Sequence, residues 1–258
     1  MIYHKNILII LIYLPHGIKD LQTMNDMNDL IEKFQNVSIA TIATHMFTLG
    51  FRSRVVLGLS PLHSNGQRMI GPAFTLRFIP SREDIDTMAS YKSEEHLHRR
   101  AMEECPPGHV LVIDARGDAS AASAGDIMLS RLQQRGGAGV VTDGGFRDTQ
   151  DIRALDFPAY HRQPASPSSP IHLHPAELNV PIGCGGVAAF PGDIVVGDDD
   201  GVVIIPEHLV DEVAAATNEM TAYEEFAAQK VTEGRSLYSV YPATDASRSE
   251  FEQWAKSK

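Results

Sequence analysis

The strongest constraint on the fold is the order of segments between residues 109 and 155. His109–Asp114 (HVLVID) and Ala138–Thr142 are short apolar runs typical of buried strands. Asp126–Arg135 carries apolar residues at helical spacing and ends at a glycine pair, and Asp148–Leu155 is expected to form the next helix. Strand, helix, strand and helix in this order predict parallel strands joined by right-handed crossovers, and hence an α/β fold.

Within this pattern, residues 115–124 are rich in small side chains and are expected to be a loop. The sequence on both sides of the pattern predicts further helices and strands. The expected helices and strands come from apolar periodicity and from the positions of proline and glycine. They are helices from about residue 28 and again after Ser38, a strand over 71–80, a helix over 94–105, a hairpin over 193–205, and a long helix from Pro206 to about Glu233.

Composition limits the class of protein and its partners. The chain has 258 residues, with 43% hydrophobic and 21% charged residues, which is ordinary for a globular protein. A formal net charge of -11 argues against nucleic acid as a partner, because phosphate binding requires a basic face. Cys105 and Cys184 are far apart without a metal-binding spacing, so a reducing, cytoplasmic location is expected.

The amino-terminal segment is expected to lie outside the fold. Ile7–Leu14 is apolar but too short to span a bilayer as a helix, and no small-residue cleavage site follows it. We therefore expect residues 1–24 to be an extension, with Met24 or Met27 as the functional start, and no membrane partner.

Charged residues follow two successive strands at positions that a parallel sheet brings together. Asp126 begins one helix, and Arg147 and Asp148 follow the next strand, with twenty residues between Asp126 and Arg147. Both positions fall at the same edge, outside the carboxyl ends of neighbouring strands. The spacing therefore predicts a cluster of these three side chains, with Asp151 as a possible fourth member.

This cluster has a chemical interpretation and a simpler alternative. Clustered carboxylates hold a hard divalent cation such as Mg²⁺, and a guanidinium grips a carboxylate bidentately. The free amides of Ile127 and Met128, in the first turn of the helix, would favour an anion. Together these groups suit a 2-oxo acid, but Asp126 and Asp148 could equally be helix caps.

Five motifs along the chain are specific in combination, namely GPAFT (71–75), AGDI (124–127), GVVTDGGFRD (139–148), PIGCGGV (181–187) and FPGD (190–193). With these motifs the sequence resembles the family that includes 4-hydroxy-4-methyl-2-oxoglutarate aldolases and regulator of ribonuclease activity A. The resemblance covers roughly residues 30–242 and implies an RraA-like α/β/β/α sandwich of the swivelling type, with parallel βαβ units and a long C-terminal helix. It also implies homotrimers or homohexamers with sites between subunits. We expect a single domain over 25–242 and a C-terminal tail over 243–258.

The resemblance implies a lyase that uses Mg²⁺ or Mn²⁺ to cleave a 4-hydroxy-2-oxo acid to pyruvate, with oxaloacetate decarboxylation as a side activity. Asp148 would bind the metal directly and Asp126 through water, and Arg147 would hold the substrate and steady the enolate. Asp151 would support a metal-bound water. The remaining substrate contacts would come from the turn formed by Gly125, Ile127 and Met128.

Several assignments stay open. Glu224 or Glu225 would reach the metal site of a neighbouring subunit, and the register does not decide between them. His161, His172 and His174 lie in a segment that departs from the short family members, where a structural role or a substrate contact is favoured over zinc. The natural substrate is open, with a sugar-derived acid as one option, and so is the general base. The alternative function is a non-catalytic protein that inhibits a ribonuclease by direct binding.

Overall fold

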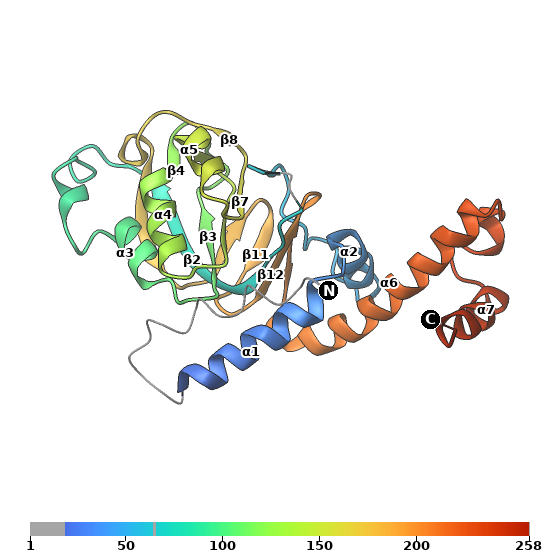
Figure 1. Cartoon of the computed structure of the whole chain (residues 1–258). Coiled ribbons are helices and arrows are strands. Elements are labelled where there is room, and N and C mark those ends of the chain that lie inside the picture. The colour runs from blue at the N-terminus through green and yellow to red at the C-terminus, as the bar shows by residue number, and fades with distance from the viewer. Residues whose placement is uncertain (1–18, 64–65, 258) are drawn as a thin grey trace.

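The computed structural model describes residues 19–63 and 66–257 (Figure 1). Within these ranges the α-helices are α1 Lys19–Phe34, α2 Ile39–Thr48, α3 Leu97–Glu104, α4 Asp126–Gln134, α5 Thr149–Ala154, α6 Val210–Thr232 and α7 Asp245–Ala255. The strands are β1 Ser60–Pro61, β2 Met69–Pro80, β3 Val110–Asp114, β4 Ala122–Ala124, β5 Gly139–Thr142, β6 Gly145–Phe146, β7 Ala159–His161, β8 Gln163–Pro164, β9 Leu173–Leu178, β10 Ile182–Cys184, β11 Val187–Ala189, β12 Ile194–Asp198 and β13 Gly201–Ile205.

The strand–helix alternation predicted between residues 109 and 155 is confirmed. β3, α4, β5 and α5 come in this order, with the short strands β4 and β6 before α4 and α5, and β3 pairs with β5 in parallel. The chain leaves α4 through Gly136 at φ +87°, a conformation that a side chain would oppose. These are the parallel βαβ units that the periodicity indicated.

The main sheet curls around its longest strand, β2. The strand order is β1-β7-β5-β3-β2-β12-β13, and β9 also pairs with β2. Residues 69–72 of β2 pair with β12, residues 73–77 pair with β3, and residues 76–80 pair with β9. Because β2 exchanges partners along its length, the sheet folds over on itself and produces two stacked layers.

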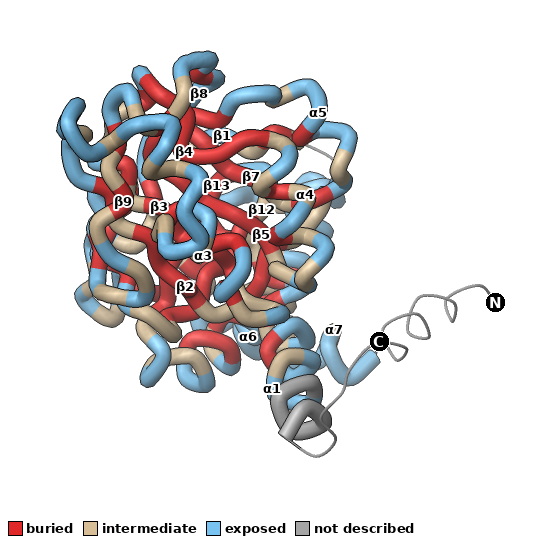
Figure 2. Tube along the Cα trace, turned by 90° about the vertical axis from the view of Figure 1, so that its left-hand side faces the viewer, coloured by how far each residue is buried: buried red, intermediate tan, exposed pale blue. Residues whose placement is uncertain are grey.

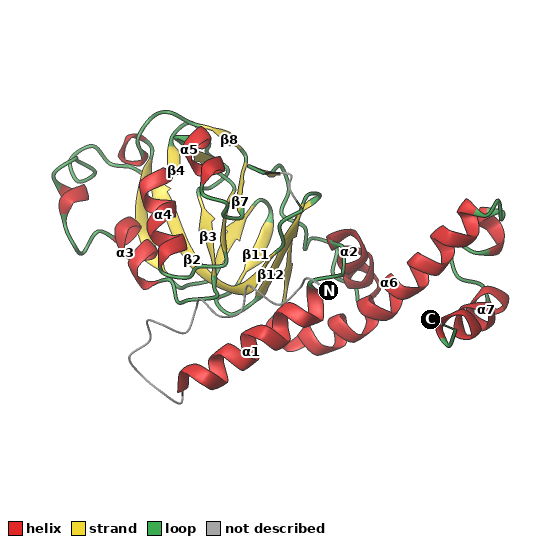
Figure 3. Ribbon diagram, viewed as in Figure 1, coloured by secondary structure: helices red, strands yellow, loops and turns green. Residues whose placement is uncertain are grey.

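The helices and strands form four layers, as the sequence resemblance implied (Figure 3). Clusters of buried side chains fill the three spaces between these layers. One cluster lies between α3, α4, α5 and the parallel strands, and a second lies between those strands and the β10–β11 and β12–β13 pairs. The third lies between β12, β13 and the helices α1, α2 and α6. Figure 2 shows the buried residues concentrated along the strands, with exposed residues on the surrounding helices. The arrangement is an α/β/β/α sandwich.

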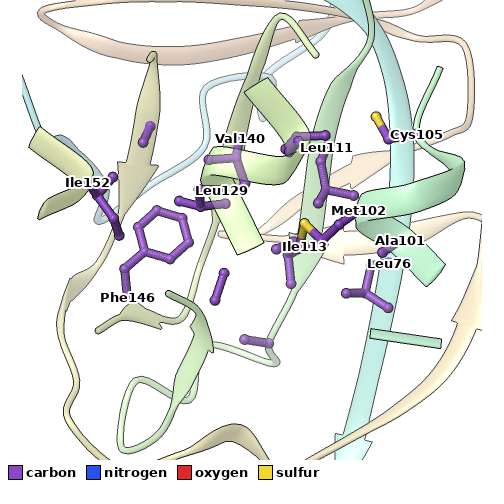
Figure 4. Close-up of a cluster of buried hydrophobic side chains, with 14 of the residues drawn as sticks. Leu76, Ala101, Met102, Cys105, Leu111, Ile113, Leu129, Val140, Phe146 and Ile152 are labelled. Atoms are coloured by element: carbon purple, nitrogen blue, oxygen red, sulfur yellow. The ribbon is translucent and has the colours of Figure 1, made fainter. Parts of the chain in front are cut away.

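The core beneath α4 fixes the position of its amino end. Leu129 of α4 is fully buried and packs with Phe146 of β6 and Ile152 of α5 (Figure 4). Burying each of these side chains contributes about 1.5–3 kcal/mol. The first turn of α4 and the turn after β6 are therefore held by one continuous core.

The carboxyl end forms a helical hairpin that extends from the body of the molecule (Figure 1). Its own small core joins Tyr223 and Phe226 of α6 to Phe251 and Trp254 of α7. The segment predicted as a tail, 243–258, thus contains an ordered helix. The predicted extension over 1–24 lies mostly outside the described residues. In the described part of the chain, no helix is long and apolar enough to cross a membrane.

Candidate active site

A small parallel sheet, β4-β6-β8, joins the two turns that carry the predicted site. Ala122 pairs with Gly145, Ala124 pairs with Phe146, and the amide of Arg147 donates to the carbonyl of Ala124 at 3.1 Å. The prediction of a loop throughout 115–124 was wrong at its end, because residues 122–124 gain strand partners that are distant in sequence. This pairing places the start of α4 beside the turn at residues 147–148.

The amino end of α4 is open to ligands. Gly125 occupies the N-cap position in an extended conformation, with φ -136° and no side-chain capping hydrogen bond. Asp126 is the first residue of the helix and not its cap. The helix itself offers no acceptor to the amides of Ile127 and Met128, so these donors favour an anion at this end.

Asp148 adopts a left-handed backbone conformation with φ 55° and ψ 38°. It stands at the N-cap position of α5, yet its side chain makes no capping hydrogen bond. Its carboxylate instead accepts a hydrogen bond from Nε of Arg147 at 2.8 Å. Aspartate tolerates this conformation at a cost of about 1 kcal/mol or more. The capping alternative therefore explains neither Asp126 nor Asp148.

Glycine is required between these groups because of close packing. A Cβ atom at Gly125 would lie 3.0 Å from Cγ of Arg147 and 3.0 Å from Oδ2 of Asp148. The guanidinium-bearing chain and the carboxylate thus lie directly over this backbone. Arg147 also reaches Ser168, whose hydroxyl lies 3.4 Å from Nη1.

One pocket of about 260 Å³ contains most of the predicted site. It includes six predicted residues from two turns, namely Gly125, Asp126, Ile127, Met128, Arg147 and Asp148. The remaining lining residues are Met88, Tyr91, His98, Ala122, Ala124, Ser168, Ser169 and Pro170. The side chains that the spacing was expected to bring together therefore border a common cavity.

Two predicted metal ligands lie elsewhere in the chain. Asp151 is an exposed residue in the first turn of α5, and it does not line the pocket. Glu224 lies on α6, where its carboxylate accepts a hydrogen bond from the hydroxyl of Thr41 at 2.9 Å. Within residues 19–63 and 66–257, no three His, Cys, Asp or Glu side chains are grouped closely enough to hold a metal ion. The roles of Asp151 and Glu224 stay predictions.

His98 is a buried part of the pocket that the sequence did not indicate. Its Nε2 lies 2.7 Å from the carbonyl of Ser123, so Nε2 carries the proton and donates. Its Nδ1 then accepts from the hydroxyl of Ser169 at 3.3 Å. Burial lowers the pKa of His98 from 6.5 to about 4. The imidazole is therefore neutral at pH 7.

Tyr91 forms another wall that no motif indicated. Its hydroxyl donates to the sulfur of Met128 at 3.2 Å. Burial raises the pKa of Tyr91, and the positive charges of Arg99 and Arg147 partly oppose that effect. The tyrosine is hence neutral beside the arginine. It belongs to residues 81–96, a segment without apolar periodicity, which is why its role was not visible in the sequence.

The three histidines of the 161–174 segment do not line the pocket. His161 is buried and stacks on Phe146, with ring centroids 5.4 Å apart. His174 pairs with Asp86 at 2.7 Å, and the carbonyl of His172 accepts from the amide of Ser81. Their contacts are structural, in agreement with one of the two favoured interpretations.

The fold and the pocket together define an α/β protein with an arginine–carboxylate site at the amino end of a helix. The family model for RraA-like proteins, described as aldolase/RraA, matches residues 38–204, and the chain belongs to this family.

Two curated proteins and one solved structure are among those similar to this chain. A Halalkalibacterium halodurans protein with the provisional name 4-hydroxy-4-methyl-2-oxoglutarate aldolase is 34% identical over 197 residues, which are 76% of this chain and 86% of that one. The 4-hydroxy-4-methyl-2-oxoglutarate aldolase of Thermus thermophilus is 32% identical over 111 residues, 43% of this chain and 67% of that one. The structure of Streptomyces coelicolor RraAS2, described as an unusual member of the RNase ES inhibitor RraA family, is similar at 33% identity and a TM-score of 0.67, covering 83% of this chain and 98% of that one.

Proposed function

We propose that this protein is a divalent-metal-dependent lyase that cleaves a 4-hydroxy-2-oxo acid to pyruvate and a second carbonyl compound. The observation that carries the proposal is the convergence of Asp126, Arg147 and Asp148 on one pocket at the open end of α4. The aldolase names of two relatives support the same reaction class.

The residues present fit a hard divalent cation. The carboxylate of Asp148 is not used for helix capping, and that of Asp126 lies on the same pocket. Mg²⁺ and Mn²⁺ prefer such oxygen donors, and Mg²⁺ commonly binds few protein groups and keeps several waters. Asp148 would hold the cation, with Asp126 acting through water. When bound, the cation would supply Lewis-acid polarisation of the keto oxygen.

The protein's own groups would orient the 2-oxo acid. Nε of Arg147 is engaged by Asp148 and Nη1 donates to Ser168, so Nη2 and the second N–H of Nη1 are the donors available for the substrate carboxylate or keto oxygen. The amides of Ile127 and Met128 would add donors to the carboxylate. The positive charge of Arg147 would stabilise the enolate that develops at the pyruvate half.

The reaction is balanced without a further reagent. The C3–C4 bond breaks, the C4 hydroxyl loses its proton as C4 becomes the carbonyl carbon of the second product, and a proton is returned to C3 to give pyruvate. Oxaloacetate decarboxylation would use the same enolate, with carbon dioxide as the leaving group. The general base is not assigned, since His98 donates Nε2–H to a carbonyl and accepts at Nδ1 from Ser169.

We also propose that the working form is a homotrimer or homohexamer in a reducing, cytoplasmic environment. In that form, Glu224 or Glu225 on the projecting helix α6 would reach the metal site of a neighbouring subunit. Glu225 is the more exposed of the two residues. The carboxylate of Glu224 accepts a hydrogen bond from the hydroxyl of Thr41 in its own chain. The mass of the purified protein by light scattering tests the assembly.

The test of the lyase is metal-dependent release of pyruvate from a panel of 4-hydroxy-2-oxo acids and oxaloacetate. We expect activity with Mg²⁺ or Mn²⁺ that is lost in chelator, and a loss of about 10²–10³-fold or more in Arg147→Ala. The variant should retain its assembly, because Arg147 is an exposed turn residue. Undiminished turnover by Asp148→Asn in chelated buffer would refute the metal-dependent mechanism.

A second candidate function, inhibition of a ribonuclease by direct binding, is favoured by the likeness to RraAS2. The net charge of -11 is compatible with a protein partner. Ribonuclease inhibition that persists in Arg147→Ala, together with no turnover of any oxo acid by the wild type, would support this candidate over the lyase.

A further inference from the structure

The pocket has an apolar side in addition to its charged groups. Met88, Tyr91, Ile127, Met128 and Pro170 line it. The side chains of Met88 and Ile127 are 64% and 79% exposed, respectively, at the mouth of a cavity that also holds two carboxylates and an arginine. Exposed apolar side chains gathered around a pocket indicate contact with an apolar ligand group.

This apolar side is held in place by the fold. Asp86, whose side chain is 4% exposed, accepts from the amide of Arg82 at 2.7 Å and pairs with His174 of β9 at 2.7 Å. The Tyr91 ring packs against His96, with centroids 4.8 Å apart. The segment 81–96 is therefore anchored to β9, and Met88 and Tyr91 form an ordered wall.

The charges of the pocket limit the number of carboxylates that it can accept. Among the described residues that line it, Arg147 is the one Lys or Arg side chain, while Asp126 and Asp148 are both acids. His98 is neutral at pH 7. Arg99, whose charge acts on Tyr91, does not line the pocket, and Arg147 is already engaged by Asp148, so a second substrate carboxylate at the wall would have no lining cation of its own, which is unfavourable.

We propose that the pocket selects 4-hydroxy-2-oxo acids with a single carboxylate and an apolar or aromatic group on C4, and that Met88 and Tyr91 determine this preference. The inference rests on the proposed lyase function. The volume of about 260 Å³ suits one compact group, since sites for drug-sized ligands occupy ~300–1,000 Å³. The wall should disfavour turnover of oxaloacetate less, because the second carboxylate of oxaloacetate loses its charge in the reaction and leaves as neutral carbon dioxide.

The test compares two substrates that differ only in the group on C4. One is 4-hydroxy-2-oxo-4-phenylbutanoate, which gives benzaldehyde and pyruvate. The other is 4-hydroxy-2-oxoglutarate, which gives glyoxylate and pyruvate. We expect kcat/KM for the phenyl substrate to be at least about tenfold higher, since a site without a partner for a polar group discriminates strongly against it.

Two substitutions test the residues that form the wall. Tyr91→Ala should lower kcat/KM at least about tenfold more for the phenyl substrate than for the carboxylate substrate. Met88→Arg should raise kcat/KM for the carboxylate substrate about tenfold by supplying a cation. Phe47, 63% exposed on α2, is the matched control position, and Phe47→Ala and Phe47→Arg should leave the substrate ratio unchanged.

The outcomes separate this inference from the proposed function. Turnover of neither substrate, nor of oxaloacetate, would refute the lyase itself. Equal turnover, or a preference for the carboxylate substrate, would refute the apolar selection while leaving the lyase intact. A substrate ratio unaltered by both Tyr91→Ala and Met88→Arg would show that this wall does not contact the C4 group.

Discussion

Gly125→Ala adds one methyl group beneath the two residues on which the proposed chemistry depends. Its Cβ would lie 3.0 Å from Cγ of Arg147 and 3.0 Å from Oδ2 of Asp148. Non-bonded carbon atoms ordinarily approach to ~3.5–4.0 Å, so the Arg147 side chain would have to move by about 0.5–1 Å. A misplacement of about 1 Å costs roughly 100-fold in rate, so we expect kcat to fall about 10- to 100-fold.

The fold should survive this substitution. Gly125 has φ -136°, which alanine adopts readily, and the atoms that must yield belong to side chains. We therefore expect the free energy of unfolding to change by no more than about 1 kcal/mol.

The assay is pyruvate release coupled to lactate dehydrogenase, with thermal unfolding measured in parallel. Gly183→Ala is the matched control, because nothing lies within 4 Å of its added Cβ. Full activity in a correctly folded Gly125→Ala protein would mean that the placement of Arg147 and Asp148 does not govern the reaction.

Three further predictions concern Asp148, His98 and Tyr223. Asp148→Asn should abolish metal-dependent turnover while retaining stability, and Asp148→Ala should in addition lose about 1 kcal/mol in denaturant titrations, because alanine tolerates φ 55° poorly. Burial lowers the pKa of His98 from 6.5 in the unfolded chain to about 4 in the folded protein. The free energy of unfolding therefore keeps the full contribution of the neutral imidazole above pH 6.5 and loses it, by about 3 kcal/mol in all, as the pH falls from 6.5 towards 4. In urea unfolding at pH 7 and pH 4.5, His98→Gln should lack this part of the pH dependence, and an identical dependence would contradict the buried neutral imidazole. Tyr223→Phe removes a hydroxyl that donates to the carbonyl of Val240 at 2.6 Å, which should cost about 1–3 kcal/mol and speed amide exchange in α7 about tenfold while leaving β3 unaffected.

The charged residues of the pocket could be predicted because their positions follow from the order of neighbouring helices and strands along the chain. Asp126 begins a helix, and the Arg147–Asp148 pair follows the next strand, so parallel topology alone brings both to the same edge. The places of Met88 and Tyr91 on the apolar side could not be predicted. Tyr91 and Met88 lie in an irregular segment, and their positions depend on the pairing of Asp86 with His174, 88 residues further along the chain.

Local pattern and composition were sufficient for the α/β class, the parallel units and the long helix α6, because apolar periodicity and glycine or proline boundaries act over a few residues. Long-range pairing alone produced the curl at β2, the β4-β6-β8 sheet and the packing of α7 on α6. These features depend on which distant surfaces bury one another, and no stretch of a few residues contains that information. The same reason explains why the pocket's acids and arginine could be predicted, whereas the placement of Met88 and Tyr91 in the pocket was seen only in the folded chain.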